Sequence, residues 1–530
     1  MRVNKKLSKV ATSASIVLCL IGLTLAQNPM CDLSQYQCNN SLALNYRTIN
    51  GLCNNLVQPW IGSVRTPMKR FQNAPSAYSS ISCDPVSIAA DGTELPPSRE
   101  VAMHLNFPED VFIDLNVFYV QFGQVLAHDI SNSVNPGDEQ GRALQCFCND
   151  TSNPLCMVLP TTKDDTVNQD QDCMGLPRTV GVNYNWNCET SAYREQINGL
   201  TSWLDNSNIY GYNLPGSQRI RNTTESGFLK VRQIEGLAGP VFPRAASGSN
   251  QCLRDSIQFP CFQGGEARTN ENLILAGIQV LLFRQHNLIA KILKSQNGWT
   301  GEKLYQETKK IINGFYQHIT YSEWLPLTIG PKMMEEYDLY PRTSGYTNVY
   351  QSTVAAQTIN EFTTAAFRFG HNMVPSIITK ADSNLKTFKS FNLSQISWSP
   401  GEGYIDGGLD AIVRGAITNR ALMGDHHFSD QLQDHLFDVG VVIGDTKRNS
   451  LSAFNIQRGR DHGIQPYNFY RNLSKLNFAN SFEDLSTNID ASSIDLLKSV
   501  YGSVNDIDLY IGGSFETNLP GANLGQTFAS

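Results

Sequence analysis

Two histidines of this chain lie in apolar segments with helical spacing, where a histidine can bind a metal or move a proton. His128 follows Gln124 by four residues, so both side chains project from the same face of a helix. His371 ends a second apolar segment and follows Arg368 by three residues. One such histidine alone is more often a hydrogen-bonded core residue. Two of them on separate helices, without the cysteine or carboxylate partners of a zinc site, favour a haem held between them.

A third segment combines a cation with a carboxylate. Within Gly265–Glu271, the sequence Gly-Glu-Ala-Arg-Thr-Asn-Glu places Arg268 at the mouth of a helix, with Glu271 on the same face. A positioned arginine can stabilise negative charge that develops during a reaction. This segment is therefore a third candidate for the site.

The elements that must position these residues are mainly helical. Apolar residues recur with helical spacing in several long segments, whereas alternating strand patterns are scarce and short. The segments are 111–129, 273–294, 302–319, 353–369 and 429–439. The proline-rich residues before them predict loops, and no internal repeat or interdomain linker is evident. The sequence predicts one large, mainly α domain over residues 27–530, with few short strands.

Composition excludes several classes of protein. With 530 residues, 41% hydrophobic and 17% charged, the chain is globular rather than disordered. Residues 1–26 combine a basic start, an apolar stretch and small final residues, the layout of a secretory signal peptide. Its removal takes away four basic residues and lowers the net charge from −7 to −11. Such a charge excludes nucleic-acid binding by electrostatics.

The rest of the chain fits a secreted, extracellular protein. The next longest apolar run, Leu273–Phe283, contains Gln279 and is short for a membrane span, so we expect a core helix and no transmembrane segment. N-glycosylation motifs predict a glycosylated surface. They begin at Asn39, Asn149, Asn222, Asn392 and Asn472.

Cysteine usage also agrees with export. Cys19 leaves with the signal peptide, and the eleven others all precede residue 262. Their spacing matches neither a zinc site nor a haem-attachment motif, so disulfides in an oxidising compartment are expected. An odd number leaves at least one thiol free or bonded to another chain, so a disulfide-linked partner is an open alternative.

Six ordered motifs carry a family resemblance that spans most of the chain. The motifs are Tyr46–Asn55, Phe122–Asp129, Leu200–Gly211, Gly265–Glu271, Phe367–His371 and Phe454–Gly463. The chain resembles the animal haem peroxidases of the peroxidase–cyclooxygenase superfamily, in the style of secreted invertebrate peroxinectin and chorion peroxidases. The resemblance implies a large helical domain with haem b between a distal and a proximal helix.

The resemblance also assigns roles to single residues. It implies that His128 and Arg268 are the distal catalytic pair, and that Gln124 positions water or halide above the iron. His371 would ligate the iron, and Asn455 would accept a hydrogen bond from that imidazole. Arg368 and Arg458 would pair with the haem propionates. These assignments predict a hydrogen-peroxide-reducing enzyme that works through an oxoferryl intermediate.

Calcium is the second cofactor that the resemblance implies. Asp129 follows the distal histidine, and the motif at Leu200–Gly211 repeats side chains every second residue, which face one way in an extended loop. Hydroxyl, carboxylate and carbonyl oxygens are ligands that calcium prefers. The expected ligands are Asp129, Thr201, Trp203 through its carbonyl, Asp205 and Ser207.

Two departures from the family pattern bear on activity. Ala127 stands where vertebrate enzymes carry an aspartate that esterifies haem, and Asn272 follows Glu271 where the chloride-oxidising member has methionine. Haem would therefore have at most one ester link, through Glu271, which makes chloride oxidation doubtful and favours phenols, iodide or thiocyanate. The second departure is the end of the chain, which stops where family members continue for several helices.

The family pattern and close spacing also suggest disulfides, with Cys31, Cys83 and Cys188 left unassigned. The suggested pairs are Cys38–Cys53, Cys146–Cys156, Cys148–Cys173 and Cys252–Cys261.

Other interpretations of the sequence stay open. The fold could serve a catalytically weak adhesion or matrix protein, or a fatty-acid dioxygenase with a substrate channel and a radical tyrosine. Arg460 is expected to be a solvated surface charge. His462 and the pair His426–His427 are expected to be structural or solvated.

Overall fold

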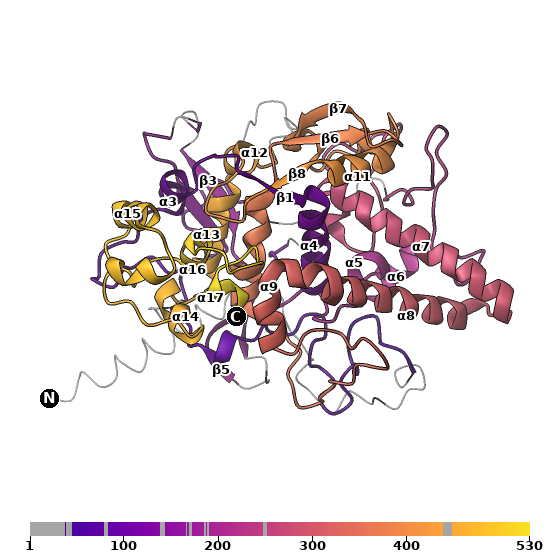
Figure 1. The fold of residues 1–530 in the computed structure, drawn as a ribbon, viewed down its shortest axis with the longest axis horizontal. Helices are drawn as coiled ribbons and strands as arrows, with labels where there is room; N and C mark the ends of the chain where they lie inside the picture. Colours follow the sequence, from indigo (N-terminus) through magenta and orange to yellow (C-terminus); the bar gives the residue numbers. More distant parts are fainter. Residues whose placement is uncertain are drawn as a thin grey trace.

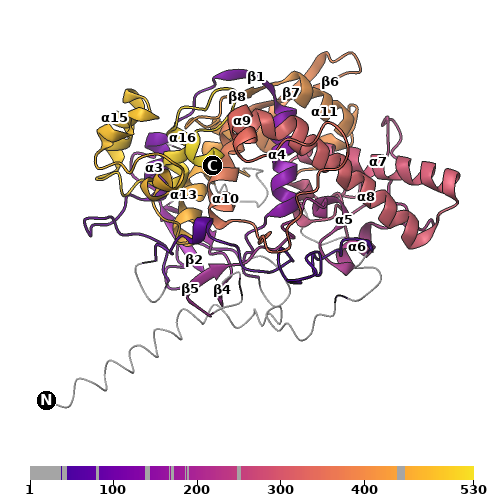
Figure 2. The same cartoon turned by 60° about the horizontal axis from the view of Figure 1, so that its bottom comes forward.

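Helix α4 (Val117–Ile130) stands between two groups of helices in the computed structural model, as both views of the molecule show (Figures 1 and 2). The long helices α7 and α8 lie on one side of it, and α13 to α16 lie on the other. The structure describes residues 38, 45–78, 83–137, 144–165, 167–168, 172–184, 187, 190–246, 252–437 and 448–530. The predicted signal peptide, Cys31 and Cys188 lie outside the described residues.

Helices make up most of the described elements. The α-helices are α3 Ser98–Leu105, α4, α5 Ser207–Tyr210, α6 Leu214–Ile220, α7 Leu273–Asn297, α8 Gly301–Ile319, α9 Leu325–Glu336, α10 Asn360–Thr364, α11 Gly408–Thr418, α12 Asp430–Gln433, α13 Leu451–Asp461, α14 Tyr467–Leu473, α15 Ala491–Val500, α16 Leu509–Phe515 and α17 Gln526–Ala529. The 3₁₀ helices are η3 Phe71–Asn73, η4 Ala267–Asn270, η6 Ala366–Met373, η7 Leu393–Ile396, η8 Gly401–Gly403 and η9 Phe482–Thr487, and η5 Thr320–Trp324 is a π-helical turn. The predicted mainly α class is confirmed.

Strands are short and pair two by two. The strands are β1 Phe112–Asn116, β2 Cys156–Pro160, β3 Cys173–Pro177, β4 Gly181–Tyr184, β5 Thr190–Gln196, β6 Ile377–Ala381, β7 Thr387–Asn392 and β8 Arg420–Leu422. They form the antiparallel pairs β1–β8, β2–β3, β4–β5 and β6–β7. No larger sheet occurs within the described part of the chain, so the core is helical.

Helix α4 begins later than its apolar pattern predicts. Residues 112–116 pair with β8 instead, and Asn116 caps the helix by accepting a hydrogen bond from the backbone of Tyr119. Gly123 then allows close packing, because a Cβ atom there would lie 2.9 Å from Cζ2 of Trp324. The indole of Trp324, from η5, therefore rests directly on the helix that carries His128.

Helices α7 and α8 match their predicted bounds closely. In α7, residues such as Leu273, Ile274 and Phe283 are fully buried, as expected of a core helix. It is the one helix of the described residues whose length and composition would suffice to cross a membrane, and 61% of its most apolar window is buried inside the protein.

Two predicted helices are wrong in extent. Residues 353–369 form only α10 and the start of η6, because Ala365 between them has non-helical backbone angles. In the segment 429–439, α12 spans four residues and ends at Gln433, because the backbone of the next residue, Asp434, is also non-helical. His371 therefore lies on a 3₁₀ helix rather than at the end of a long α-helix.

The four suggested disulfides are confirmed. Cys38–Cys53, Cys146–Cys156, Cys148–Cys173 and Cys252–Cys261 are all bonded. Cys83, left unassigned by the sequence, is also disulfide-bonded. No cysteine of the described residues is free.

Candidate active site

One cavity receives both histidines that the sequence singles out. His128 from α4 and His371 from η6 line it, together with Gln124, Glu271 and Asn272. It encloses about 920 Å³ that protein atoms do not fill, its open mouth included. Most of the other lining residues are apolar, among them Val120, Phe369, Val374, Leu432 and Leu436. A large apolar cavity with a few convergent polar groups is typical of a cofactor site.

A buried carboxylate connects the two distal candidates. Glu266 Oε2 accepts a hydrogen bond from Arg268 Nε at 2.8 Å, and its Oε1 lies 3.3 Å from His128 Nδ1. Burial alone raises the pKa of Glu266, but Arg268 and His128 outweigh it and hold that pKa at about 2. Because the angles at His128 do not make a hydrogen bond, His128 Nδ1 and Glu266 Oε1 both keep bonding capacity.

The glutamine and the proposed ester-forming glutamate are held together. Gln124 donates from Nε2 to Glu271 Oε1 at 3.1 Å and accepts from Asn272 Nδ2 at 2.8 Å. Asn272 also caps α7, since its Oδ1 accepts from the backbone of Leu275. The start of α7 therefore fixes Gln124, and Glu271 Oε2 lies 3.7 Å from His128 Nε2.

His371 contacts the residue predicted to support it. Asn455, on α13, places Nδ2 3.1 Å from His371 Nδ1, while its Oδ1 accepts from Arg368 Nη1 at 2.7 Å. The amide thus presents its nitrogen to the imidazole rather than the predicted oxygen. Burial, and then the charge of Arg368, lower the pKa of His371 to about 3. A neutral imidazole of this kind can ligate a metal.

Arg368 is a half-buried cation without an acidic partner among the described residues. Its guanidinium donates to Asn455 and to the carbonyl of Thr363, and it pairs with no carboxylate of the described residues. Burial, and then the like charge of Arg458, lower its pKa to about 10. Since a buried unpaired charge is costly, this position suits an anionic group such as a haem propionate.

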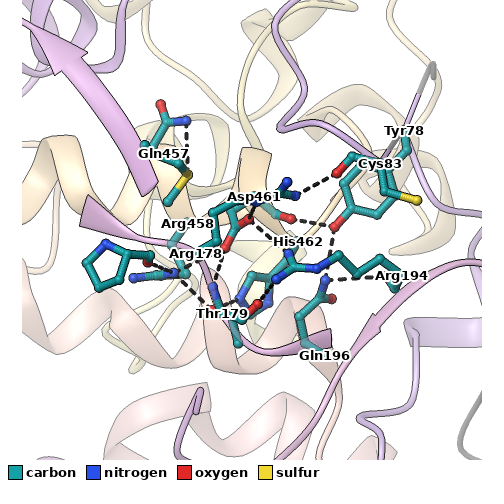
Figure 3. A network of polar contacts seen from close by, with 12 residues as sticks. Tyr78, Cys83, Arg178, Thr179, Arg194, Gln196, Gln457, Arg458, Asp461 and His462 are labelled. Carbon is teal, nitrogen blue, oxygen red and sulfur yellow. Dashed lines mark hydrogen bonds and ion pairs between the residues drawn. The ribbon is translucent and has the colours of Figure 1, made fainter. Parts of the chain in front are cut away.

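Arg458 belongs to a polar network that centres on one carboxylate (Figure 3). Asp461 contacts three guanidinium groups: Arg178 Nε at 2.7 Å, Arg194 Nη1 at 3.2 Å and Arg458 Nη1 at 3.1 Å. The backbone of Thr179 also donates to it, at 2.8 Å. Burial opposes ionisation of Asp461, but the arginines keep its pKa well below the usual range. Three cations on one anion leave a local excess of positive charge.

The structure also shows the surroundings of Arg460, His462 and the pair His426–His427. Arg460 is not a solvated charge, because it is 5% exposed and makes two hydrogen bonds to Asp508. His462 is structural as expected, with its ring nitrogens 2.6 Å from Asn360 Oδ1 and 2.7 Å from Thr179 Oγ1. The pair His426–His427 is half-buried, its rings 4.0 Å apart.

The expected calcium ligands converge on one buried loop. Asp129 Oδ2 accepts from the backbone of Asp205 at 3.1 Å, and its carbonyl accepts from Ser207 Oγ at 2.7 Å. Thr201 Oγ1 donates to Asp205 Oδ2 at 3.1 Å and lies 3.5 Å from the carbonyl of Trp203. Two buried carboxylates face each other, and burial together with Asp205 raises the pKa of Asp129. Asp205 Oδ1 lacks a partner. This donor set fits calcium.

Sequence reasoning missed three residues that organise the site: Glu266, Trp324 and Asp461. Glu266 lies two residues before Arg268, so its position in that motif was the available signal. Trp324 has no motif, yet its indole donates to the carbonyl of Tyr119 at 3.0 Å and forms part of the cavity wall. Asp461 was visible only as part of a charge run.

A cavity that presents two histidines from separate elements, near an arginine without an acidic partner, is the arrangement that a haem protein uses. The profile of the animal haem peroxidase family matches residues 46–530, and this chain belongs to that family. The family implies haem as the cofactor, and calcium is typical of it. The resemblance seen in the sequence is thus confirmed, while the peroxinectin or chorion subtype stays a prediction.

The relatives include proteins about three times as long as the matched region and others closer to it in length. The chain is 34% identical to the peroxidasin homolog of Homo sapiens over 506 residues, which cover 91% of this chain and 33% of that protein. It is 30% identical to a peroxidase of Drosophila melanogaster, with 91% and 70% covered, and 29% identical to myeloperoxidase of Mus musculus, with 91% and 68% covered. The chain spans about a third of the length of the peroxidasins that it matches.

Solved structures share the fold. Peroxidase A of Dictyostelium discoideum superposes with a TM-score of 0.74 at 27% identity, over 92% of this chain and 89% of that one. A fatty acid alpha-dioxygenase of Oryza sativa gives a TM-score of 0.67 at 18% identity, over 91% and 76%. The second likeness concerns the fold alone.

Proposed function

We propose that this chain is a secreted haem peroxidase that reduces hydrogen peroxide to water while oxidising small donors. The observation that carries the proposal is the shared cavity of His128 and His371, which Gln124 and Glu271 also line. Haem, when bound there, supplies the redox chemistry. The disulfides support an oxidising compartment, and the motif residues Asn149, Asn392 and Asn472 are exposed, as glycosylation requires.

On the proximal side, His371 would hold the iron through Nε2 and Arg368 would pair with a propionate. An imidazole that binds a metal through Nε2 carries its proton on Nδ1, so it needs an acceptor there. Asn455 can supply one if its amide turns over to present Oδ1. The propionate would then replace Asn455 as the acceptor for Arg368. Arg458, beside the excess positive charge around Asp461, would serve the second propionate.

On the distal side, His128 would take a proton from hydrogen peroxide and return it to the departing oxygen. Glu266, close to Nδ1, favours the imidazolium that forms between these two steps. Arg268 would stabilise the negative charge that develops on the departing oxygen. Gln124 would orient peroxide or water, since Glu271 and Asn272 fix its amide.

Calcium would bind Asp129, Asp205, the Thr201 and Ser207 hydroxyls and the Trp203 carbonyl. Asp129 directly follows His128 on α4, so the ion would lock the end of that helix. The orphan Oδ1 of Asp205 supports this role. Calcium would therefore fix the orientation of the His128 side chain.

Ala127 limits covalent attachment of haem. It lines the cavity but offers no carboxylate, so Glu271 is the one candidate for an ester bond. A single ester bond withdraws less electron density from the haem than two, which makes the haem a weaker oxidant. We therefore propose phenols, iodide or thiocyanate as donors rather than chloride. The test is a steady-state assay of the haem-loaded protein with hydrogen peroxide and each donor. Turnover of a phenol or of iodide is expected, and no peroxide-dependent oxidation of any donor would refute the proposal.

A fatty-acid dioxygenase is the second candidate, because an apolar cavity adjoins the haem cavity. It encloses about 830 Å³ with its mouth, between α4, α9 and α17, and shares Trp324, Phe367 and Phe369 with the haem cavity. Tyr321, whose pKa burial raises, also lines it. Oxygen uptake with palmitate and other fatty acids decides between the two functions. The peroxidase proposal predicts none.

A further inference from the structure

A second polar cavity lies away from the haem cavity, between residues 45–56 and helix α8. It encloses about 1030 Å³ that protein atoms do not fill, its open mouth included. Its charged lining residues are Arg47, Lys309 and Lys310, and no described carboxylate lines it. The chain as a whole carries a net charge of −7, so a cavity whose charged lining residues are all cations is opposite in sign to the whole chain.

None of the three cations forms a salt bridge with a described carboxylate, although the charges of Asp205 and Asp129 act on Lys309 from farther away. Arg47 lies over the ring of Trp203 at 5.3 Å, and Lys309 Nζ lies 5.2 Å from the ring centre of Tyr210. Neither they nor Lys310 pair with a carboxylate of the described residues. Lys309 is only 4% exposed. Since burial makes the charge of Lys309 costly, and Arg47 and Lys310 add like charges without salt bridges, the cavity favours an anion.

The neutral polar groups of the cavity also favour an anion. Asn54 Nδ2 is a buried donor without a partner. Gln317 already donates to the carbonyl of Leu204 at 2.9 Å, and Asn313 already accepts from Asn206 at 2.9 Å. The unpartnered Nδ2 of Asn54 can therefore donate to an oxyanion beside the three cations.

The same contacts join the cavity to the calcium loop. Arg47 lies over the ring of Trp203, Gln317 donates to the carbonyl of Leu204, and Asn313 accepts from the side chain of Asn206. The charges of Lys309 and Arg47 also act on Asp205, one of the proposed calcium ligands. The cations of the cavity and a calcium ion would therefore repel one another across the loop.

We propose that this cavity binds a sulfate or phosphate group, and that its occupation strengthens calcium binding. An oxyanion offsets the charges of Arg47, Lys309 and Lys310, which removes repulsion from the calcium ion. By linkage, calcium strengthens oxyanion binding by the same factor. The anion site goes beyond the proposed peroxidase function, and the coupling rests on the calcium site proposed with it.

Calorimetric titration of the calcium-loaded holoprotein tests the site. Inorganic sulfate and glucose 6-phosphate form separate arms, at matched ionic strength in sodium chloride, which distinguish a free oxyanion from an oxyanion on a sugar. Binding with a Kd of about 1 mM or tighter is expected in at least one arm. Arg47→Gln and Lys310→Gln, both at exposed positions, should each weaken it about 10-fold, whereas Lys303→Gln, outside the cavity on the same helix, should not. Absence of binding in both arms, or equal affinity in all variants, overturns the site.

A second titration tests the coupling. Calcium is titrated into metal-depleted holoprotein with and without saturating sulfate, and sulfate should tighten calcium binding about 5-fold or more. The Arg47→Gln variant should lose this gain. An unchanged calcium affinity overturns the coupling. If calcium does not bind at all, the calcium site itself fails, and the first titration still decides whether the anion site exists.

Discussion

The distal and proximal sides of the haem cavity use their polar groups differently. On the distal side, His128 Nδ1 and Glu266 Oε1 lack hydrogen-bond partners, and the side chain of Arg268 is 22% exposed. On the proximal side, Asp461 is fully buried and contacts three guanidinium groups, while both ring nitrogens of His462 are bonded.

The difference separates two tasks. The groups around Asp461 and His462 use their bonding capacity within the protein, which gives a rigid base to α13, the helix whose Asn455 contacts His371. On the distal side, His128 Nδ1 and Glu266 Oε1 face each other at 3.3 Å, so the carboxylate can stabilise a proton that the imidazole takes up during the reaction. We therefore expect proximal substitutions to cost mainly stability and distal substitutions to cost mainly rate.

Asp461→Asn should have the largest effect. It leaves Arg178, Arg194 and Arg458 without their shared carboxylate, and an uncompensated buried charge costs about 3–5 kcal/mol. Denaturant-induced unfolding of the haem-loaded protein measures the loss. Asp410→Asn, which breaks the partly exposed pair with Arg284, is the control and should cost less. Equal losses in the two variants would contradict a special role for the proximal network.

Arg268→Ala should slow the reaction with hydrogen peroxide while haem and fold persist. Loss of one such charge-stabilising donor costs about 10²–10³ in rate. Stopped-flow absorption at several peroxide concentrations measures it, and Arg284→Ala, remote from the cavity, is the matched control. An unchanged rate in Arg268→Ala would remove the residue from the mechanism.

Glu266→Gln should have a smaller effect, of about 10-fold on the peroxide reaction. Stopped-flow absorption measures the rate, as for Arg268→Ala. The pKa of Glu266 is about 2 in the folded protein against 4.5 ordinarily. Glu266 therefore contributes stability above pH 4.5 that is lost as the pH falls through about 2. The variant should lose this part of the acid sensitivity. An unchanged rate with hydrogen peroxide would argue against contact between Glu266 and His128 in the working enzyme.

Ala127→Asp should change attachment of haem with little change in stability. The new carboxylate would face the cavity and could form a second ester bond during peroxide turnover. The fraction of haem that resists acid-organic extraction should rise, whereas in Glu271→Gln all haem should become extractable. Doubly esterified haem in the wild-type protein, seen by mass spectrometry, would show that a carboxylate outside this account takes part.

The sequence predicts a residue's role well when its partners lie within the same short motif, and poorly when they lie far away along the chain. Short motifs predicted one site for His128, Arg268 and His371; the two histidines line one cavity, whereas Arg268 does not line it and connects to His128 through Glu266. The partners of Asp461 did not follow, because Arg178 and Arg194 lie more than 260 residues earlier in the chain. Arg460 looked solvated for the same reason, since its partner Asp508 belongs to another segment.

Local patterns also failed where the backbone breaks a helix. The apolar spacing over 353–369 is helical, yet the angles at Ala365 divide the segment into α10 and η6. β1 replaces the start of α4 because β8 offers it backbone partners. Such tertiary pairing overrides the periodicity of a single segment.

The absorption spectrum of the haem-loaded protein, before and after one equivalent of hydrogen peroxide, tests most directly whether haem binds between His128 and His371. In the wild type, we expect a Soret band that peroxide shifts. In His128→Ala the band should persist but respond far more slowly, and in His371→Ala it should weaken or disappear. His462→Ala should retain the band, because that residue bonds Asn360 and Thr179 rather than lining the cavity. Equal loss of the band in His371→Ala and His462→Ala, or a normal peroxide response in His128→Ala, would contradict a haem placed between His128 and His371.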